Sequence, residues 1–478
     1  MNKHRIFIVI LFLLCMGSRS INAQEKYSAD WESLDHREIP AWFSQAKFGI
    51  LIHWGVYSVP AYAEPIPGEE GAFAEWYGPN VMYKGWRNDS FHEGNFGNDF
   101  TYRDFGTLFK AELWDPVDWA SLFSASGAKY VVLTAKHHDG FCLWDTKDPV
   151  SSSWNSMETG PGRDLIGELA AAVRGNRLKF GVYYSLLEWE STRTDWPFDE
   201  RYANERTGYY VPGQIWEKYH IDDELFVEHI HFQLKELARN YRPDLIFVDG
   251  AWDHPDTYWR STEFLSWLYN SSPNKRNVVV NDRWGSNTPG KHGDYYSGEH
   301  AGISYSPEHP WEKLLAMGQS FGYNRAEDIE DLKSSGELIE LLCKTVSKGG
   351  NLLLNVGPDA DGRIPLIQQE RLIEIGNWLE VNGDAIYKTN PYHLESNQHT
   401  FTRNTSSIFA FQYEWTQGSI KISLPEELKI KNCNLLGHDK KLVWKRQGPD
   451  LLIIPPVLSP DNELIRHVYV FQIILDQN

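Results

Sequence analysis

Two patterns of hydrophobic positions divide the chain. Before about residue 358, short runs of Val, Ile and Leu recur without alternation, as in strands that are buried on both faces of a parallel sheet. These runs cover residues 48–53, 130–137, 180–185, 245–249, 278–283 and 352–356. Helical periodicity predicts helices between several of the strands, at residues 115–126, 165–173, 223–241 and 337–346.

Alternating strands and helices predict either a barrel or an open doubly wound sheet. No Gly-x-Gly-x-x-Gly follows the first strand and no Walker-type Gly-Lys-Ser/Thr occurs, which weakens a nucleotide-binding open sheet. Chemistry in a barrel lies at the carboxyl ends of the strands. Polar residues fall there, namely His53, His137, Tyr184, Asp249 and Arg283. We therefore predict an α/β fold, a (β/α) TIM-like barrel, over residues 24–385.

After about residue 386 the pattern changes to alternation of apolar and polar positions. Residues 407–413, 419–424 and 468–475 alternate in this way, with short turns between segments. Such a texture is typical of an antiparallel β-sandwich, which we predict over residues 386–478. Residues 281–309, rich in His, Gly and Asp, are predicted to form a long loop, where function often resides.

The N-terminus predicts export. Lys3 and Arg5 precede an apolar run at residues 6–15, and small or polar residues follow up to Ala23, so residues 1–23 are predicted to be a cleaved signal peptide. The run is shorter than the roughly 20 residues of a membrane span, and no other stretch is long enough. We expect a periplasmic or secreted protein without a membrane span, lysosomal if the source is a eukaryote.

Composition narrows the possible partners. Lys plus Arg is 46 against 65 Asp plus Glu, a net charge of −19, which argues against nucleic acid as a partner. The 20 Trp residues suit either a core or platforms for sugar rings. Beyond the signal peptide, Cys142, Cys343 and Cys433 allow at most one disulfide, and none is at metal-ligand spacing.

Asp249 is the strongest single candidate for a catalytic residue. It ends an apolar run and precedes Gly250, so its carboxylate is placed at a strand terminus beside a turn. One interpretation is a solvated Asp-Gly turn. The other is a nucleophile or charge stabiliser, which requires a rigid and partly desolvated anion.

The adjacent pair His137-His138 allows three interpretations. With His53 and Asp249 the pair resembles a zinc ligand set, but no His-Glu-x-x-His or helix-borne ligand pair occurs, so no metal is predicted. In the second interpretation, one histidine lies in the core and the other at the surface. In the third interpretation, the imidazoles bind sugar hydroxyls.

Carboxylates beside aromatic rings favour sugar chemistry. Glu75-Trp76 offers an acceptor next to a flat apolar face, and Arg283 offers a donor, although a structural salt bridge would explain Arg283 equally well. No Gly-x-Ser-x-Gly elbow is present. Paired carboxylates, as in glycosidases, are the best remaining chemistry. The candidates for a second carboxylate besides Asp249 are Glu188, Glu299, Glu308 and Glu312.

Taken together, the motifs resemble those of the α-L-fucosidases of glycoside hydrolase family 29. They are, in the family's order, FGILIHWG at 48–55, EWY at 75–77, KHHDGF at 136–141, VDG at 248–250, NDRW at 281–284 and GGNLLLNVGP at 349–358. The resemblance implies a barrel enzyme that hydrolyses terminal α-L-fucose from fucosylated oligosaccharides or glycoconjugates with retention and without a cofactor. Asp249 would be the nucleophile. Fucose binding would fall on His53, Glu75, Trp76, His137, His138, Tyr184, Arg283 and Phe321.

The acid/base residue is the least fixed part of the resemblance. The segment GDYYSGE at 293–299 resembles the place where bacterial members carry their acid, which selects Glu299. Glu312, after Trp311, is the alternative. Tyr184 is chosen over Tyr183 from strand alternation alone. Rival functions are a non-catalytic fucose-binding lectin, a metal-dependent hydrolase built on His137 and His138, and a glycosidase for a related sugar such as α-L-galactose.

Overall fold

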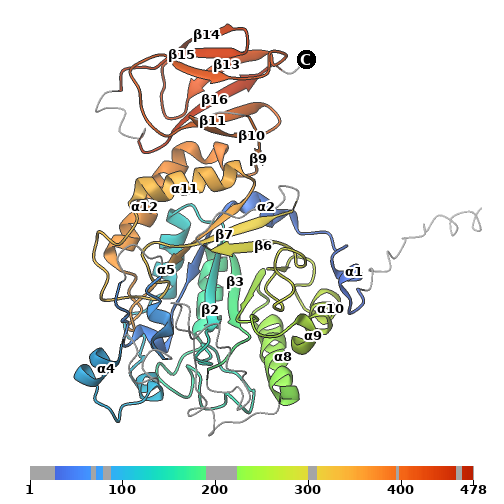
Figure 1. The fold of residues 1–478 in the computed structure, drawn as a ribbon, viewed down its shortest axis with the longest axis vertical. Coiled ribbons are helices and arrows are strands. Elements are labelled where there is room, and N and C mark those ends of the chain that lie inside the picture. Colours follow the sequence, from blue (N-terminus) through green and yellow to red (C-terminus); the bar gives the residue numbers. More distant parts are fainter. Residues whose placement is uncertain are drawn as a thin grey trace, which may run out of the picture.

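The computed structural model describes residues 27–65, 71–78, 88–189, 223–299, 309–394, 398–458 and 466–476. The predicted signal peptide and the candidate Glu308 lie outside these residues. The described chain forms a parallel β-barrel with surrounding helices and, stacked on it, an antiparallel β-sandwich, as Figure 1 shows. Both parts of the predicted fold class are therefore confirmed.

Eight parallel strands form the barrel in chain order. They are β1 Phe48–Ile52, β2 Tyr130–Lys136, β3 Lys179–Ser185, β4 Leu245–Asp249, β5 Val279–Val280, β6 Tyr296–Glu299, β7 Trp311–Ala316 and β8 Asn351–Val356. The order in the sheet is β5-β4-β3-β2-β1-β8-β7-β6. The first strand, β1, pairs with both β2 and the last strand, β8, so the strands follow one another around a barrel. In a doubly wound sheet the strand order would instead reverse at a switch point.

The barrel ladder is interrupted between β5 and β6. Within the described part of the chain these two strands are not paired, but the Asp282 carboxylate accepts hydrogen bonds from the Ser297 backbone N–H at 3.0 Å and from Ser297 Oγ at 2.7 Å. A buried side chain thus joins the two edges. The predicted loop over residues 281–309 is wrong in part, because it contains β6. The sequence Tyr-Ser-Gly-Glu of this strand has no apolar run that would mark it.

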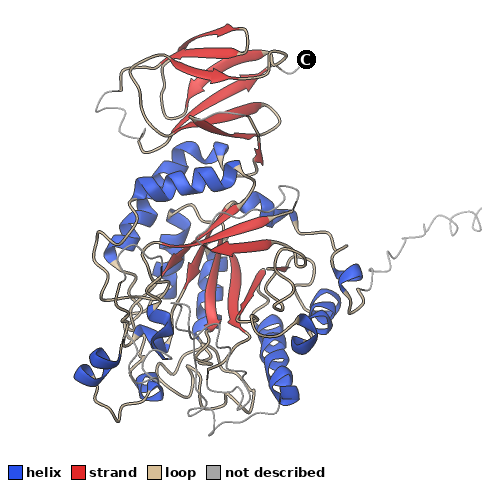
Figure 2. Ribbon diagram, viewed as in Figure 1, coloured by secondary structure: helices blue, strands red, loops and turns tan. Residues whose placement is uncertain are grey.

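Helices cover the outside of the barrel, as the blue ribbons in Figure 2 show. The longer ones are α5 Pro116–Ala125, α6 Leu165–Gly175, α8 Asp223–Asn240, α10 Ser261–Ser271, α11 Ser335–Ser347 and α12 Leu366–Asn382. Short helices are α1 Trp31–Leu34, α2 Ala41–Ala46, α4 Asp89–Asn95 and α9 Asp256–Trp259. The four predicted helices are confirmed as α5, α6, α8 and α11. Asp115 caps α5 as expected, since its carboxylate accepts from the Val117 N–H at 2.7 Å.

Alternate residues of each strand point into the barrel and out to the helices. The interior cluster includes Leu51, Val132, Tyr183, Phe247 and Leu353, whereas their chain neighbours pack against the helix layer. Such interior layers make the barrel a packed core, so the site can only lie above them at the strand ends.

The sandwich is built from two antiparallel sheets. One holds β9 Asn390–Pro391, β10 His399–Arg403, β11 Ser407–Gln412, β13 Ile430–Leu435 and β16 Tyr469–Leu475, and the other holds β12 Ile420–Ser423, β14 Val443–Gln447 and β15 Asp450–Ile454. Helices α11 and α12 lie between the barrel and the sandwich (Figure 1). A hydrogen bond from Trp378 Nε1 to the Val468 carbonyl, at 2.9 Å, ties α12 to it.

Two further properties concern the helices and the cysteines of the described residues. No helix among them combines the length and apolar character that crossing a membrane requires. The thiols of Cys142, Cys343 and Cys433 are free and buried.

Candidate active site

Asp249 lies at the carboxyl end of β4, held by two donors. Tyr183 donates its hydroxyl hydrogen to Asp249 Oδ2 at 2.8 Å, and Arg283 Nη1 donates to Oδ1 at 3.0 Å. Burial by itself favours the neutral acid, but the Arg283 charge and the Tyr183 hydrogen bond hold the pKa of Asp249 below its ordinary value. Asp249 is therefore a rigid, buried carboxylate anion.

The same guanidinium nitrogen also binds Glu299, the last residue of β6. Arg283 Nη1 lies 2.6 Å from Glu299 Oε1 and 3.0 Å from Asp249 Oδ1, while Arg283 Nε donates to Ser297 Oγ at 3.0 Å. Because Asp249 Oδ1 and Glu299 Oε1 both contact Arg283 Nη1, the distance between these two oxygens is at most the sum of their distances to that nitrogen. The Glu299 side chain is 35% exposed, so it faces the mouth of the barrel.

Three histidines gather opposite this pair. The His137 ring centroid lies 5.5 Å from that of His53 and 4.2 Å from that of His138, and His53 lies 5.4 Å from the Tyr183 ring. Burial lowers the pKa of His53 and of His138 to about 4, and lowers that of His137 as well. All three are therefore neutral imidazoles at neutral pH, each with one donor and one acceptor nitrogen.

Side-chain partners fix two of these rings. His53 Nδ1 donates to Asn355 Oδ1 at 2.6 Å, and His138 Nδ1 bonds to Ser185 Oγ at 2.5 Å. His137 Nδ1 is buried and has no hydrogen-bond partner among the described residues. An orphaned nitrogen of this kind costs free energy unless a ligand satisfies it.

Aromatic rings form the walls of the site. Phe321 packs against His53 at 5.1 Å, and Trp76 packs against His138 at 5.1 Å. Trp252 stacks on Trp76 at 6.1 Å with an interplanar angle of 25° and is 48% exposed, so a flat aromatic surface extends from the interior to solvent. Flat apolar faces of this kind stack on sugar rings.

Glu75 supports the Phe321 wall from below. Its Oε2 accepts from the Gly322 N–H at 2.9 Å, and burial raises the pKa of Glu75 to about 7. Glu327 accepts from the backbone N–H groups of Gln319 and Ser320, each at 2.7 Å, on the other side of the same loop. Two carboxyl groups, Glu75 fully buried and Glu327 partly buried, therefore fix the loop that carries Phe321.

The structure corrects the choice of tyrosine on β3. Tyr184 points away from the site: its hydroxyl donates to Gln233 Oε1 at 2.7 Å and accepts from Lys136 Nζ at 3.0 Å. Tyr183 instead reaches Asp249. The reason is that Tyr183 shares the inward face of β3 with Ser185, and alternation puts Tyr184 on the helix-facing side.

Glu312 lies deeper in the barrel than Glu299, because it pairs in register with Ser297, two residues before Glu299 on β6. It is near the start of β7, pairs with Asn351 at the start of β8, and is fully buried. Tyr130 donates its hydroxyl hydrogen to Glu312, and burial raises the pKa of Glu312 to about 8, so the side chain is a neutral acid inside the barrel. This position does not fit the alternative role of Glu312 as acid/base residue.

Glu188 is also excluded as a partner for Asp249, since Lys136 and His229 bind its carboxylate. Among the described candidates, only Glu299 binds the same guanidinium nitrogen of Arg283 as Asp249. Of the tryptophans near the predicted site residues, Trp76 and Trp252 line the site, whereas Trp54 and Trp284 are buried between barrel and helices.

Several lining residues were not predicted from the sequence. They are Tyr183, Ser185, Trp189 and Asn355. Strand alternation carries a signal for Tyr183 and Ser185, once Asp249 is known to pair in register with Ser185. Within the described ranges, no group of three or more His, Cys, Asp and Glu side chains is arranged to hold a metal ion.

A parallel barrel with two carboxylates bridged by an arginine at its carboxyl end, among histidines and aromatic rings, is the arrangement of a glycoside hydrolase. Residues 14–384 match the family model described as Alpha-L-fucosidase. The chain is 41% identical to human tissue alpha-L-fucosidase over 467 residues, 95% of this chain and 93% of that protein, and 40% identical to the bovine protein over 453 residues, 93% and 91%.

Solved structures agree with the sequence relatives. The alpha-fucosidase of Thermotoga maritima in complex with fucose superposes with a TM-score of 0.77 at 37% identity, covering 94% of this chain and 100% of that chain. The protein therefore belongs to the α-L-fucosidase family.

Proposed function

We propose that this protein is a retaining exo-glycosidase that removes terminal α-L-fucose from fucosylated oligosaccharides or glycoconjugates. The observation that carries the proposal is the bridging of Asp249 and Glu299 by Arg283 Nη1. Retaining enzymes hold their two carboxyl groups about 5–5.5 Å apart, whereas inverting enzymes need roughly 6.5–9.5 Å to admit a water. Two oxygens that touch one nitrogen fit the shorter spacing.

Asp249 is assigned as the nucleophile. Its carboxylate attacks the anomeric carbon while Glu299 donates a proton to the departing glycosidic oxygen, which leaves a covalent fucosyl ester and a free alcohol. A water then attacks the same carbon, Glu299 takes its proton, and the ester bond to Asp249 breaks to release fucose. For Glu299 to act first as an acid, its ion pair with Arg283 has to give way when the glycoside enters.

Fucose recognition is assigned to the side chains that surround this pair. The neutral imidazoles of His53, His137 and His138 supply donors and acceptors for the ring hydroxyls, and the orphaned His137 Nδ1 supports such a partner. Trp76 and Phe321 supply apolar faces. Glu75 and Arg283 complete the set, and Tyr183 replaces Tyr184 in it.

Export is part of the proposal. The relatives include proteins named tissue and plasma alpha-L-fucosidase, names that fit a secreted or lysosomal protein, and the predicted signal peptide agrees with them.

The stereochemical outcome tests the proposal directly. Wild-type enzyme is mixed with an aryl α-L-fucoside, and the anomeric proton of the released fucose is followed by NMR from the first seconds. We expect α-L-fucose to form first and to equilibrate slowly to the β anomer. Initial β-L-fucose would contradict retention, and absence of any fucose release would contradict the function itself.

Variants separate the roles of the two carboxylates. Asp249→Gly is expected to lower turnover at least about 1,000-fold, with partial recovery in added azide or formate, because a small anion fills the space of the missing nucleophile. Asp253→Gly on the same loop is the matched control and should retain activity. Glu299→Gln should hydrolyse substrates with poor leaving groups most slowly; wild-type rates on these would remove Glu299 from the mechanism.

A further inference from the structure

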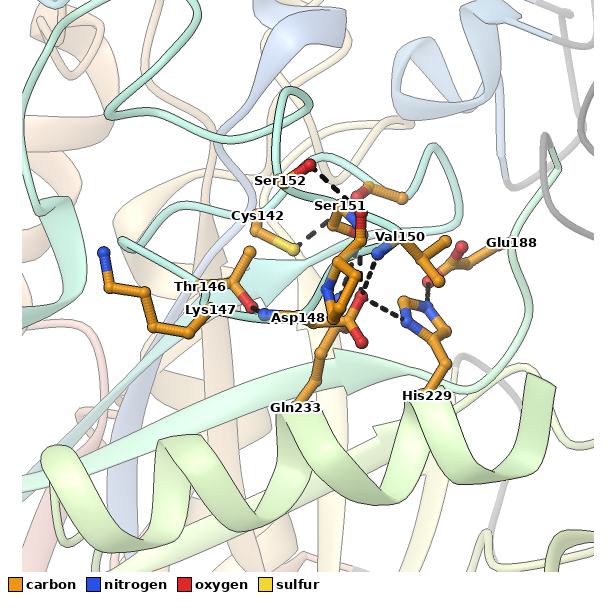
Figure 3. A network of polar contacts seen from close by, with 12 residues as sticks. Cys142, Thr146, Lys147, Asp148, Val150, Ser151, Ser152, Glu188, His229 and Gln233 are labelled. Atoms are coloured by element: carbon orange, nitrogen blue, oxygen red, sulfur yellow. Dashed lines mark hydrogen bonds and ion pairs between the residues drawn. The ribbon is translucent and has the colours of Figure 1, made fainter. Parts of the chain in front are cut away.

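A chain of four ionisable side chains lies buried directly behind the site. Lys136 at the end of β2 binds Glu188, which accepts from His229 Nε2 at 2.8 Å, and His229 Nδ1 bonds to Asp148 Oδ2 at 2.8 Å. Each of these side chains is at most 4% exposed. Figure 3 shows His229 reaching from α8 between the Asp148 and Glu188 carboxylates.

The residues of this chain are the immediate neighbours of the pocket wall. Lys136 precedes His137 and His138, and Glu188 precedes Trp189. The backbone N–H of Trp189 donates to the His138 carbonyl at 2.7 Å, and the Trp189 ring lies 5.6 Å from the His138 ring. A displacement of Glu188 therefore moves Trp189 and the adjoining histidine wall.

The geometry requires a particular protonation state of His229. Both ring nitrogens face carboxylates, and an ionised carboxylate only accepts hydrogen bonds. A neutral imidazole carries one N–H, so only the imidazolium donates to Asp148 and Glu188 together. Two cations, Lys136 and His229, then balance two anions in a desolvated place.

The surrounding charges agree with this state. Burial lowers the pKa of His229, but Glu188 and Asp148 outweigh it, and the pKa is raised overall. Lys136 and His229 in turn hold the pKa of Glu188 below its ordinary value against the effect of burial. The other titratable groups at the network are the Tyr184 hydroxyl, the Cys142 thiol and, two turns further along α8 from His229, Glu236. Burial raises the pKa of Tyr184 and of Cys142, so both stay neutral.

We propose that His229 is a positioning residue for the sugar pocket: as an imidazolium it clamps Asp148 to Glu188, and fucose affinity falls when it loses a proton. The inference rests on the proposed function, because it concerns affinity for fucose. His229 acts through Trp189 and His138 and does not touch the reacting atoms. At alkaline pH one of its two hydrogen bonds is lost and the wall is released.

Asp148→Asn tests the clamp with little change of shape. Asp148 Oδ2 also accepts from the backbone N–H groups of Val150 and Ser151, each at 3.1 Å, and an amide oxygen preserves these bonds. The substitution removes one negative charge from beside the imidazolium, and a neighbouring opposite charge is worth about 1–3 pKa units. The alkaline loss of affinity should therefore shift to lower pH by about one unit or more.

The dissociation constant of L-fucose is measured by calorimetry from about pH 5.5 to 9 for the full-length mature protein. Asp35→Asn is the matched control, because Asp35 binds a different histidine, His292 Nδ1, at 2.8 Å and away from the site. The control should superpose on wild type. Glu75, with a pKa near 7, titrates in every variant, so only the shift between variants is diagnostic.

His229→Gln should bind fucose at least about 5-fold more weakly at all pH values and should lose the alkaline transition. If that variant does not fold, the nitrogen spectrum of histidine-labelled wild type replaces it, with an imidazolium expected for His229 at neutral pH. A neutral ring, or an Asp148→Asn profile that superposes on wild type, overturns the role of His229 alone. Wild type that neither binds nor releases fucose overturns the proposed function as well.

Discussion

At the scale of single residues, Arg283 links the two carboxylates on which the proposed chemistry depends. Its Nη1 stabilises the Asp249 anion and simultaneously engages Glu299. One residue thereby keeps the proposed nucleophile ionised and limits its distance from the proposed acid/base residue. Arginine suits this role because its fork of donors is rigid and always charged.

The two adjacent tyrosines of β3 should behave differently. Tyr183→Phe removes the hydrogen bond that lowers the pKa of Asp249, so the acidic limb of the kcat/KM profile should move to higher pH, and kcat/KM should fall about tenfold. Tyr184→Phe should instead lower the Tm, because the Gln233 and Lys136 contacts are lost. An acidic limb that moves in Tyr184→Phe and not in Tyr183→Phe would reverse the assignment.

Glu312 makes stability depend on pH in a defined direction. Its pKa is about 8 in the folded protein against 4.5 ordinarily, so the folded state binds the extra proton between these values, and stability falls as pH rises through that window. Glu312→Gln is neutral throughout. The Tm of the variant minus that of wild type should therefore increase from about pH 5 to 8, with activity retained. A difference that stays constant with pH would show that Glu312 is ionised.

The predicted site residues that belong to a motif lie close together in the structure. Asp249, His53, His137, His138, Trp76, Arg283, Glu299 and Phe321 meet at one end of the barrel. The choice of Tyr184 over Tyr183 is wrong because two adjacent tyrosines give no sign in the sequence of which one faces inward. The sequence leaves Glu312 as an alternative because it does not tell how deep in the barrel a strand residue lies.

At the scale of elements, the strands that were predicted are those with apolar runs. β6 escaped prediction because its four residues carry polar side chains, and its place in the barrel depends on the Asp282 contact with Ser297, which spans the gap to β5. This weakly paired strand carries Glu299. Helices α10 and α12 were likewise not predicted, whereas α5 was marked by Asp115-Pro116.

The cap of α5 gives a prediction at this scale. Asp115→Ala removes the acceptor of the Val117 N–H and should lower the free energy of unfolding by about 1 kcal/mol. Denaturant unfolding of the variant and wild type measures the difference. Since α5 lies outside the site, KM should stay unchanged. Equal stability of the two proteins would show that the Asp115 cap does not stabilise the fold.

At the scale of the whole molecule, a barrel holds the chemistry and a sandwich packs beside α11 and α12. The change from buried apolar runs to alternation distinguishes the parallel barrel from the antiparallel sandwich, since each sheet type leaves its own periodicity. The contacts between the parts, such as Trp378 to Val468, carry no sequence signal.

Thiol chemistry offers a prediction for the molecule as a whole. The three described cysteines are free and buried, so no disulfide among them contributes to the stability of the described fold. The Tm in excess dithiothreitol should equal the Tm without it to within about 1 °C. A fall of several degrees would reveal a disulfide that holds the fold.

The proposed mechanism requires that Asp249 forms a covalent bond to fucose. The enzyme is incubated with a 2-fluorinated fucosyl fluoride, whose fluorine slows release of the ester, and is then digested with a protease and analysed by mass spectrometry. We expect one fluorofucosyl group, located by fragmentation on the Asp249 carboxylate. A label on Glu299 or on any other residue, or hydrolysis without a label under conditions that trap the intermediate, would contradict it.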